Sequence, residues 1–185
     1  MKKLAIFSLI AIFALASLQL SAKETKNLAT RTQKKEIKTE RKELRKLEGN
    51  VVSDRSKNAF ISIFGNVPNI NWKRSNNFDE ATFTKDGKKM TSFFDFDSNL
   101  VGTTSVKTFA DLPLAAQKEV KLKYKDYQIG PVILFDDNEA NDTDMILYDT
   151  QFDDADNYFV ELSKDNSKTI LRVNTDGAVF FFKKI

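Results

Sequence analysis

The sequence predicts an α+β fold built as a tandem repeat, in which one helix precedes a four-stranded antiparallel meander in each copy. Two stretches, 53–64 and 111–125, carry apolar residues at the three- and four-residue spacing of an amphipathic helix. Each is followed by short aromatic and β-branched segments separated by turn residues, the pattern of antiparallel strands. Matching turn residues recur at a nearly constant distance along the chain. Such a period indicates repeated structural units.

Local signals define the two predicted helices. Ser53 can cap the first helix, Gly65 closes it, and Pro68 prevents its continuation. Asp111 is the expected cap of the second helix, and Pro113 lies near its first turn. The apolar residues of the helices are Ala59, Phe60, Ile63 and Phe64 in the first and Leu114, Ala116, Val120 and Tyr124 in the second.

The strands and turns define the repeat. The predicted strands are 70–74, 80–84, 90–96 and 100–108 after the first helix, and 127–135, 158–163, 169–173 and 178–182 after the second. The turn segment 85–89 matches 164–168 at an offset of 79, and 97–100 matches 175–178 at an offset of 78. The helices are offset by only about 60, so the second copy holds an insertion. The copies span about 53–108 and 111–185, with the insertion at 136–156.

The first residues have the three parts of a secretory signal peptide. Lys2 and Lys3 form a positive start, 4–18 is an apolar run interrupted only by serines, and Ala22 offers a small residue at the cleavage point. The run is shorter than the roughly 20 residues of a membrane-spanning helix. We therefore expect removal of residues 1–22, export to the periplasm or the medium, and no stable membrane insertion; a retained anchor is the alternative.

Residues 23–50 are predicted to be a basic charged spacer, since 23–48 hold ten Lys or Arg against five Glu. A helix over 32–47 would bury too thin an apolar stripe to pack on a core. A solvated spacer is expected, and contact with anionic lipid or polysaccharide is the alternative. Nucleic acid is not an expected partner, because the segment has no interleaved aromatic residues and the chain is exported.

Composition excludes several classes of enzyme. The chain has no cysteine and no histidine. Thiolate chemistry, serine–histidine and cysteine–histidine triads, and zinc sites of nitrogen and sulfur are therefore ruled out. A carboxylate pair acting on sugars remains open, but no pattern singles one out. We expect no enzymatic activity and no cofactor.

A family resemblance rests on structural motifs of the domain at 51–185. Its residues are the helix start Asp111-Leu112-Pro113, Tyr124 and Tyr127 at the helix end, Trp72 two residues after Ile70, the turn 83–87, and Phe93-Phe94-Asp95. They resemble the PepSY-like, β-lactamase-inhibitor-like (BLIP-like) secreted bacterial proteins over about 52–185. The resemblance implies one sheet with both helices on one face, and no activity. The inhibitor that names the fold binds its enzyme across the open sheet face. The missing cysteines and the acidic insertion depart from the pattern, so β-lactamase inhibition is not expected here.

Alternation along the strands separates the two sheet faces. The residues predicted to lie under the helices are small or apolar in both copies: Ala81, Phe83, Ser92 and Phe94 in the first, and Val160, Leu162, Leu171 and Val173 in the second. Trp72 is also assigned to the core. If Asp176-Gly177 is a two-residue hairpin turn, Val173 faces Phe180 and Arg172 faces Phe181.

The opposite face is then expected to be open. Its predicted members are Phe93, Phe159, Ile170, Arg172 and Phe181. Three phenylalanines and an arginine on a solvent-facing surface are typical of a protein-binding patch. The alternative is that the insertion or the basic segment covers this face.

The insertion carries nine acidic residues and no basic ones. Its candidate calcium ligands are Asp137, Glu139, Asp142 and Asp144, although the glycine and spaced glutamate of an EF-hand are absent. A solvated acidic loop, or one docked on the basic segment, is the alternative. The apolar run 145–148 is predicted to add a short strand or pack on an edge.

The functional hypothesis from the sequence is a non-catalytic exported binding module that recognises a protein or peptide through the open sheet face. A small-ligand or calcium-binding envelope protein acting through the insertion is the alternative.

Overall fold

The computed structural model describes residues 36, 39–40, 43 and 49–185. The predicted signal peptide, 1–22, and almost all of the predicted spacer lie outside these residues. Residues 49–185 form one unit, to which the following description applies. In the part of the chain described, no helix is both long and apolar enough to cross a membrane.

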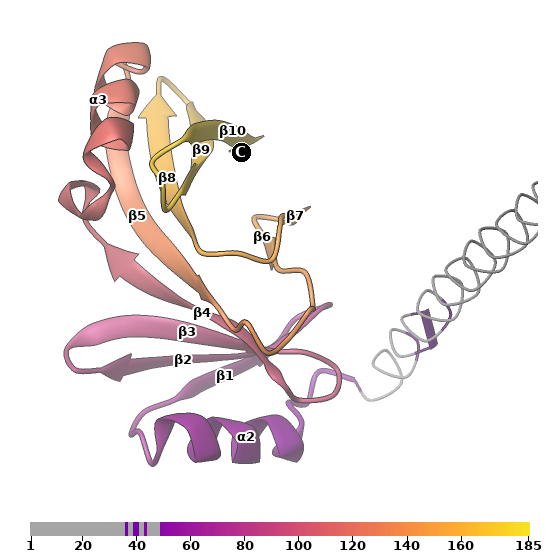
Figure 1. Cartoon of the computed structure of the whole chain (residues 1–185). Coiled ribbons are helices and arrows are strands. Elements are labelled where there is room, and N and C mark those ends of the chain that lie inside the picture. Colours follow the sequence, from indigo (N-terminus) through magenta and orange to yellow (C-terminus); the bar gives the residue numbers. More distant parts are fainter. Residues whose placement is uncertain (1–35, 37–38, 41–42, 44–48) are drawn as a thin grey trace, which may run out of the picture. The chain divides into compact units, whose positions relative to one another are not determined.

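Eight strands of this unit form one antiparallel sheet, and each strand pairs with its neighbours in chain order (Figure 1). They are β1 (Asn71–Arg74), β2 (Asp79–Lys85), β3 (Lys88–Phe94), β4 (Leu100–Lys107), β5 (Gln128–Asp137), β8 (Asn157–Lys164), β9 (Ser167–Asn174) and β10 (Val179–Lys184). Two short strands of the insertion, β6 (Ile146–Leu147) and β7 (Thr150–Gln151), pair with each other as a separate hairpin.

Helix α2 (Asp54–Phe64) precedes β1 and begins and ends as predicted. The Ser53 hydroxyl accepts the Arg55 N–H at 3.1 Å. Gly65 closes the helix with φ 78°, and its N–H donates to the Ile61 carbonyl. That left-handed conformation is accessible to glycine without strain.

Helix α3 (Leu114–Lys123) begins later than predicted, because Asp111 belongs to the 3₁₀ turn η1 (Phe109–Asp111). The Asp111 carboxylate turns back to accept the N–H and hydroxyl of Thr108, both at 2.7 Å. The prediction that Asp111 caps the second helix is therefore wrong. Pro113 stands at the start of α3 without a side-chain cap.

Each helix covers its own apolar cluster on the sheet. Under α2, Phe60 packs with Ala81, Phe83 and Phe94, and the Trp72 ring lies 5.5 Å from that of Phe60. Under α3, the buried residues are Leu112, Ala116, Val120, Val132, Val160, Leu162, Leu171 and Val173. All eight residues predicted to lie under the helices are buried. That prediction and the core assignment of Trp72 are confirmed.

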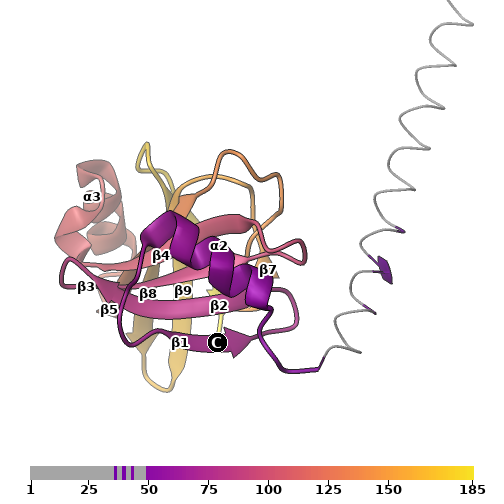
Figure 2. The ribbon, with the colours of Figure 1, turned by 90° about the horizontal axis from the view of Figure 1, so that it is seen from below.

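Strand register places both clusters on the same sheet face. Directly paired residues share a face, and so do residues two apart on one strand. Ser92 pairs with Thr103, Ser105 pairs with Leu134, and Val132 pairs with Val160. Because side chains alternate without interruption along these parts of β3, β4 and β5, the residues under α2 and the residues under α3 lie on the same face of the sheet. Figure 2 views the same arrangement from the α2 end.

The β9–β10 register differs by one residue from the prediction. Val173 pairs with Val179, Arg172 with Phe180, and Leu171 with Phe181. The loop has three residues rather than two, because the Gly177 N–H donates to the Asn174 carbonyl while Gly177 adopts φ 93°. The Asn174 side chain accepts the Ala178 N–H, which fixes this longer loop. As a result Phe181 lies on the helix-bearing face, and the prediction that it faces the side of Arg172 is wrong.

Candidate binding surface

The sheet face opposite the helices is covered by the insertion. The β6–β7 hairpin lies on the side of the sheet away from α3 (Figure 1). The exposed fractions of Phe93, Phe159 and Ile170 are 7%, 1% and 0%. The prediction that these three residues face solvent is wrong, because the insertion brings apolar side chains of its own. The sequence also allowed the alternative that the insertion covers this face, and the structure agrees with that alternative.

The cluster that joins insertion and sheet is called here the insertion core. Its buried members are Phe78, Phe93, Val101, Phe135, Phe159 and Ile170 of the sheet side and Met145 and Phe152 of the insertion. The Phe152 ring packs edge-to-face on Phe159 at 5.0 Å and on Phe135 at 5.2 Å. Lys183 donates to the Tyr148 carbonyl, and Arg172 donates to Asp153 at 3.2 Å. Apolar packing and polar contacts thus hold the insertion on the sheet.

The magnitude of this burial decides whether the covered face can serve as a site. Burying one large apolar side chain stabilises the fold by about 1.5–3 kcal/mol. Met145 and Phe152 are both buried, and Ile146, Leu147 and Tyr148 are partly buried against the same cluster. Lifting the insertion would forfeit a large share of the roughly 5–15 kcal/mol that stabilises a domain. The face therefore stays closed in the folded protein.

Solvent-exposed aromatic residues gather instead on the edge strand β10. Within the described residues β10 pairs only with β9. Phe180 is 45% exposed and Phe181 is 65% exposed, and successive strand residues point to opposite faces. The Arg172 guanidinium lies 5.4 Å from the Phe180 ring centroid, within cation–π range. The edge therefore presents one ring on each face of a strand whose outer side has no partner strand among the described residues.

The other edge strand, β1, is protected. It has four residues, against six in β10. Its Arg74 side chain is buried in an ion pair with Asp79 at 2.8 Å, and Lys73 is exposed. Short length and charge are common protections of a sheet edge against pairing. In β10 the charged residues stand only at the end of the strand, after Phe182.

The candidate calcium ligands of the insertion do not form one metal site in the described residues. Asp144 accepts from the Gln151 side chain, and the Asp153 carboxylate pairs with Arg172. Within the described residues, no three His, Cys, Asp or Glu side chains lie close enough together to hold a metal ion. The candidate calcium ligands Asp137, Glu139, Asp142 and Asp144 are thus not brought together as one described cluster.

Asp137, at the end of β5, is the titratable group most changed by its surroundings. Its pKa is raised to about 7. The largest cause is burial, followed by the hydrogen bond with Asp154, the charge of Asp154 and the charge of Glu139. Its Oδ1 atom is buried with no hydrogen-bond partner. Burial and the charge of Asp156 also raise the pKa of Asp136. Asp137 therefore holds a proton near neutral pH, where an ordinary carboxylate has lost it.

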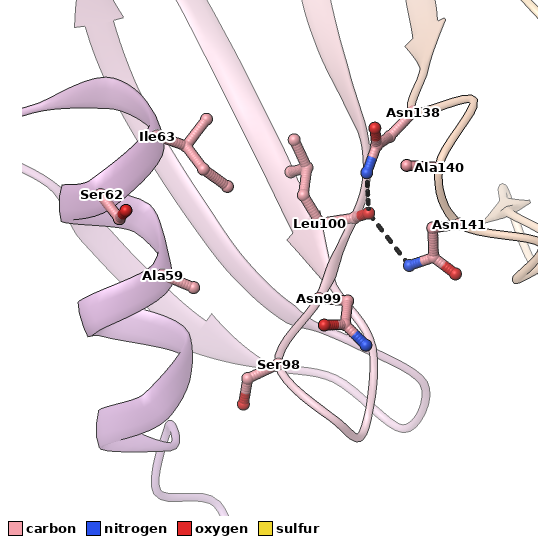
Figure 3. A pocket seen from close by; sticks show the side chains of 9 residues that line it. All are labelled: Ala59, Ser62, Ile63, Ser98, Asn99, Leu100, Asn138, Ala140 and Asn141. Atoms are coloured by element: carbon pink, nitrogen blue, oxygen red, sulfur yellow. Dashed lines mark hydrogen bonds between the residues drawn. The ribbon is translucent and has the colours of Figure 1, made fainter.

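A cleft of about 300 Å³ opens between α2, the β3–β4 turn and the insertion (Figure 3). It is lined by Ala59, Ser62, Ile63, Ser98, Asn99, Leu100, Asn138, Ala140 and Asn141, none of them charged. The Asn138 and Asn141 amides donate to the Leu100 carbonyl at 2.7 and 3.0 Å. These bonds fix the wall that the insertion contributes.

Two groups of exposed residues were not identified from the sequence. Phe180 was missed because the two-residue turn assigned it to the core, and the Asn174 side chain was the signal for a longer loop. Leu114 and Leu122 are the second group, with exposed fractions of 73% and 78%. The sequence placed Leu114 among the apolar residues of the second helix together with Ala116 and Val120, and helical spacing alone does not show that Leu114 lies on a different side of that helix.

Comparison with known proteins supports the fold. The sequence matches no protein-family model and no curated protein. Three solved structures are similar over most of both chains. A BLIP-like protein from Bacteroides fragilis has a TM-score of 0.56 at 18% identity, covering 75% of this chain and 90% of its own. A DUF2874 family protein from Bacteroides uniformis has a TM-score of 0.58 at 13% identity, covering 73% and 89%. A candidate periplasmic protein from Bacteroides eggerthii has a TM-score of 0.58 at 15% identity, covering 73% and 88%.

At these identities the likeness concerns the fold alone. The BLIP-like fold expected from the sequence is confirmed, and the PepSY-like part of that expectation stays a prediction.

Proposed function

We propose that this chain is an exported, non-catalytic binding module that recognises an extended segment of a protein or peptide by strand addition at β10. The observation that carries the proposal is the pair of exposed rings, Phe180 and Phe181, on an edge strand that pairs only with β9 among the described residues. Adding a strand to an exposed sheet edge is a recurrent mode of peptide recognition. The module works without a cofactor.

The strand itself indicates how such a segment would be held. Backbone groups of the partner pair with the outer N–H and C=O groups of β10, which gives affinity with little dependence on sequence. The Phe180 and Phe181 rings cover the added strand from either face, and Arg172 keeps Phe180 in place through its guanidinium. The irregularity in pairing between Phe181 and Lys183 confines regular strand addition to 179–181. The favoured partner is therefore a short apolar segment.

Export rests on two supports. The sequence of residues 1–22 has the parts of a signal peptide. One structural neighbour is a candidate periplasmic protein. The periplasm or the cell exterior is the place we propose for the partner.

The tandem repeat is also part of this proposal. The alternation of buried and exposed residues over 51–69 recurs residue for residue over 111–129. The turns at Asp95 and Asn174 are alike, since the N–H of Ser98 or Gly177, three residues on, donates to the carbonyl of Asp95 or Asn174. These likenesses at offsets of 60 and 79 support two copies of one helix-plus-meander unit.

One observation favours the alternative, a small-ligand envelope protein. The cleft of about 300 Å³ takes one wall, Asn138, Ala140 and Asn141, from the insertion. Its uncharged lining suits a neutral ligand. Calcium lacks comparable support in the contacts of the acidic residues.

The experiment that tests strand addition is affinity capture from envelope and medium fractions, using the chain from residue 23 as bait. A Phe180→Ala/Phe181→Ala variant removes both rings, and Ile61→Ala/Ile63→Ala removes two exposed apolar residues of α2 as the matched control. We expect a partner that the control retains and the β10 variant loses. Amide exchange on the purified pair should then slow in β10. A partner that leaves β10 exchange unchanged contradicts the proposal.

A further inference from the structure

The two helices provide an internal comparison. Over 51–69 and 111–129 the buried, half-buried and exposed positions coincide, so residues 60 apart occupy equivalent places. Equivalent buried positions pack on the sheet, for example Ser56 and Ala116, or Phe60 and Val120. A difference on the outer side of the helices is therefore not demanded by the fold.

The outer stripes of the helices differ in chemistry. On α2 the equivalent exposed residues are Asp54, Asn58 and Ser62, whereas on α3 they are Leu114, Lys118 and Leu122. Leu114 and Leu122 are 73% and 78% exposed, the highest values among the large apolar residues described. They lie about 12 Å apart along the helix, on one side, since eight residues make a little over two turns. Two leucines thus stand in water where the matching helix has polar residues.

Lysines surround these leucines without neutralising partners. Lys118, Lys121 and Lys125 are exposed and form no ion pair within the described residues. The one acidic residue of α3, Glu119, is bound to Lys123 at 2.7 Å. Among described elements, none lies outside α3, which stands at the margin of the unit in both views (Figures 1 and 2). The outer face of α3 is therefore apolar, basic and accessible.

We propose that the outer face of α3 binds an anionic lipid surface. Exposed leucines between lysines are the composition of a helix that lies in the plane of a bilayer surface. The lysine stems extend along the apolar boundary and place their ammonium groups beside lipid phosphates. A protein partner is the less suitable occupant, because this face has no Trp, Tyr or Arg, the residues that dominate protein interfaces. The binding is peripheral and reversible, and the surface is separate from the β10 edge.

The strength expected is modest. Each lysine near an anionic surface strengthens binding about fivefold. Each leucine that enters the boundary adds about tenfold. Three lysines and two leucines suffice for adsorption that added salt weakens, because the charge term is screened.

The first test is partitioning of the chain from residue 23 between buffer and vesicles. Vesicles of phosphatidylglycerol and phosphatidylethanolamine are compared with phosphatidylcholine alone. Leu114→Ser/Leu122→Ser should lower binding to the anionic vesicles about tenfold or more. Ile61→Ser/Ile63→Ser, which removes exposed apolar residues from α2, should leave it unchanged. The basic residues of 23–48 are identical in every variant, so a difference reports on the helices.

A second measurement separates α3 from the basic segment. The chain has no cysteine, so one introduced cysteine accepts a single environment-sensitive dye. Lys118→Cys places the dye on the outer face of α3, and Asn58→Cys places it at the equivalent position of α2. We expect anionic vesicles to shift the emission of the α3 dye to the blue and to leave the α2 dye unchanged.

Two outcomes overturn the proposal. If vesicles bind and neither dye shifts, the basic segment alone is responsible. If no vesicle binds, the α3 face serves a protein or nothing at all. Failure here leaves the β10 proposal untouched, because capture at β10 is measured without lipid.

Discussion

A buried polar network around Asp79 connects α2 with the first strands. The Asp79 side chain is 1% exposed and pairs with Arg74, itself 7% exposed, at 2.8 Å. The same carboxylate accepts the Ser53 N–H at 3.1 Å and the Ser56 hydroxyl at 2.8 Å. Its charge therefore lies at the N-terminus of α2, where the helix dipole favours an anion. One residue fixes the helix and the edge strand together.

Replacing Asp79 by alanine should therefore destabilise the protein by about 3–5 kcal/mol, because the buried Arg74 guanidinium loses its ion pair with Asp79 and the Ser53 N–H and Ser56 hydroxyl lose their shared acceptor. Chemical denaturation measures the change. The double variant Arg74→Met/Asp79→Leu should lose less stability than the single variant, since it removes the buried Arg74 charge together with that of Asp79. Equal losses would mean that the Ser53 and Ser56 contacts, and not the ion pair, carry the effect.

Asp137 gives stability a pH dependence of its own. Its folded pKa of about 7 lies above the unfolded value of about 3.9. Below both values the carboxyl is protonated in either state and has no effect. As pH rises between them, the unfolded state ionises first, so the folded state loses relative stability until pH exceeds about 7.

Asp137→Asn should remove this loss and raise stability near pH 8 by about 1 kcal/mol, after allowance for solvent screening. Denaturation curves at mildly acidic and mildly basic pH measure it. Asp142→Asn removes the same charge from an exposed place in the insertion. If it gives the same gain, general charge repulsion and not the Asp137 environment is the cause.

Single residues were predictable where local chemistry decides the outcome. The Ser53 cap, the Gly65 closure and the helix-covered set from Ala81 to Val173 follow from side-chain type and alternation. The exposure of Phe93, Phe159 and Ile170 does not, because it depends on where a segment distant in sequence packs. The sequence contains the same residues whether that face is open or covered.

At the scale of elements, the β9–β10 loop shows how one residue of register redistributes side chains. Asp176-Gly177 favours a two-residue turn, yet the Asn174 side chain accepts the Ala178 N–H at 2.8 Å and stabilises a loop of three. Phe181 thereby changes face and Phe180 meets Arg172. The two possible turns differ in free energy by less than the packing energy of the strands that they join. Packing therefore decides the register, and the turn residues alone do not predict it.

Strands β4 and β5 approach closely at Gly102. A Cβ atom there would lie 2.4 Å from the Phe135 ring and 2.7 Å from the Asp136 carbonyl oxygen. Gly102→Ala should destabilise the protein by about 1–3 kcal/mol or more, because a backbone atom and a buried ring must both move. Gly130→Ala is the control, with its nearest atom at 3.2 Å. Thermal unfolding measures the stability loss of each variant. Similar losses for Gly102→Ala and Gly130→Ala would contradict the idea that the contact at Gly102 is unusually tight.

The insertion is the element that the sequence described least well. Its acidity suggested a solvated loop or an ion site, and the run 145–148 suggested a short strand or an edge contact. The strand forms as β6, but Met145 and Phe152 enter the interior of the protein. Composition averaged over a segment conceals two buried side chains among nine acidic ones.

At the scale of the whole molecule, three separate apolar clusters stabilise the fold. One lies under α2 and involves β1 to β4. A second lies under α3 and involves β5, β8 and β9. The insertion core alone combines residues of both halves, such as Phe93 and Val101 with Phe159 and Ile170. The insertion therefore couples the two halves as well as covering the sheet.

This coupling predicts how the molecule unfolds. Trp72 is the single tryptophan of the chain and lies in the α2 cluster, so its fluorescence reports on the first half. Circular dichroism reports on both halves. For the natural chain the two signals should change together in denaturant, as one cooperative transition requires. Met145→Ala, which leaves a cavity in the insertion core and costs about 2–5 kcal/mol, should separate them.

The matched control is Val120→Ala, which makes a cavity under α3 but leaves the insertion core intact. Val120→Ala should lower the free energy of unfolding, but the fluorescence and circular dichroism signals should still change together, because the insertion core still connects the two halves. If Met145→Ala lowers the midpoint and the curves still coincide, the backbone pairing of β4 with β5 is enough to couple the halves. If the curves separate only for Met145→Ala, the insertion is what makes two helix-plus-sheet halves into one folding unit, and its permanent closure over the sheet follows from that role.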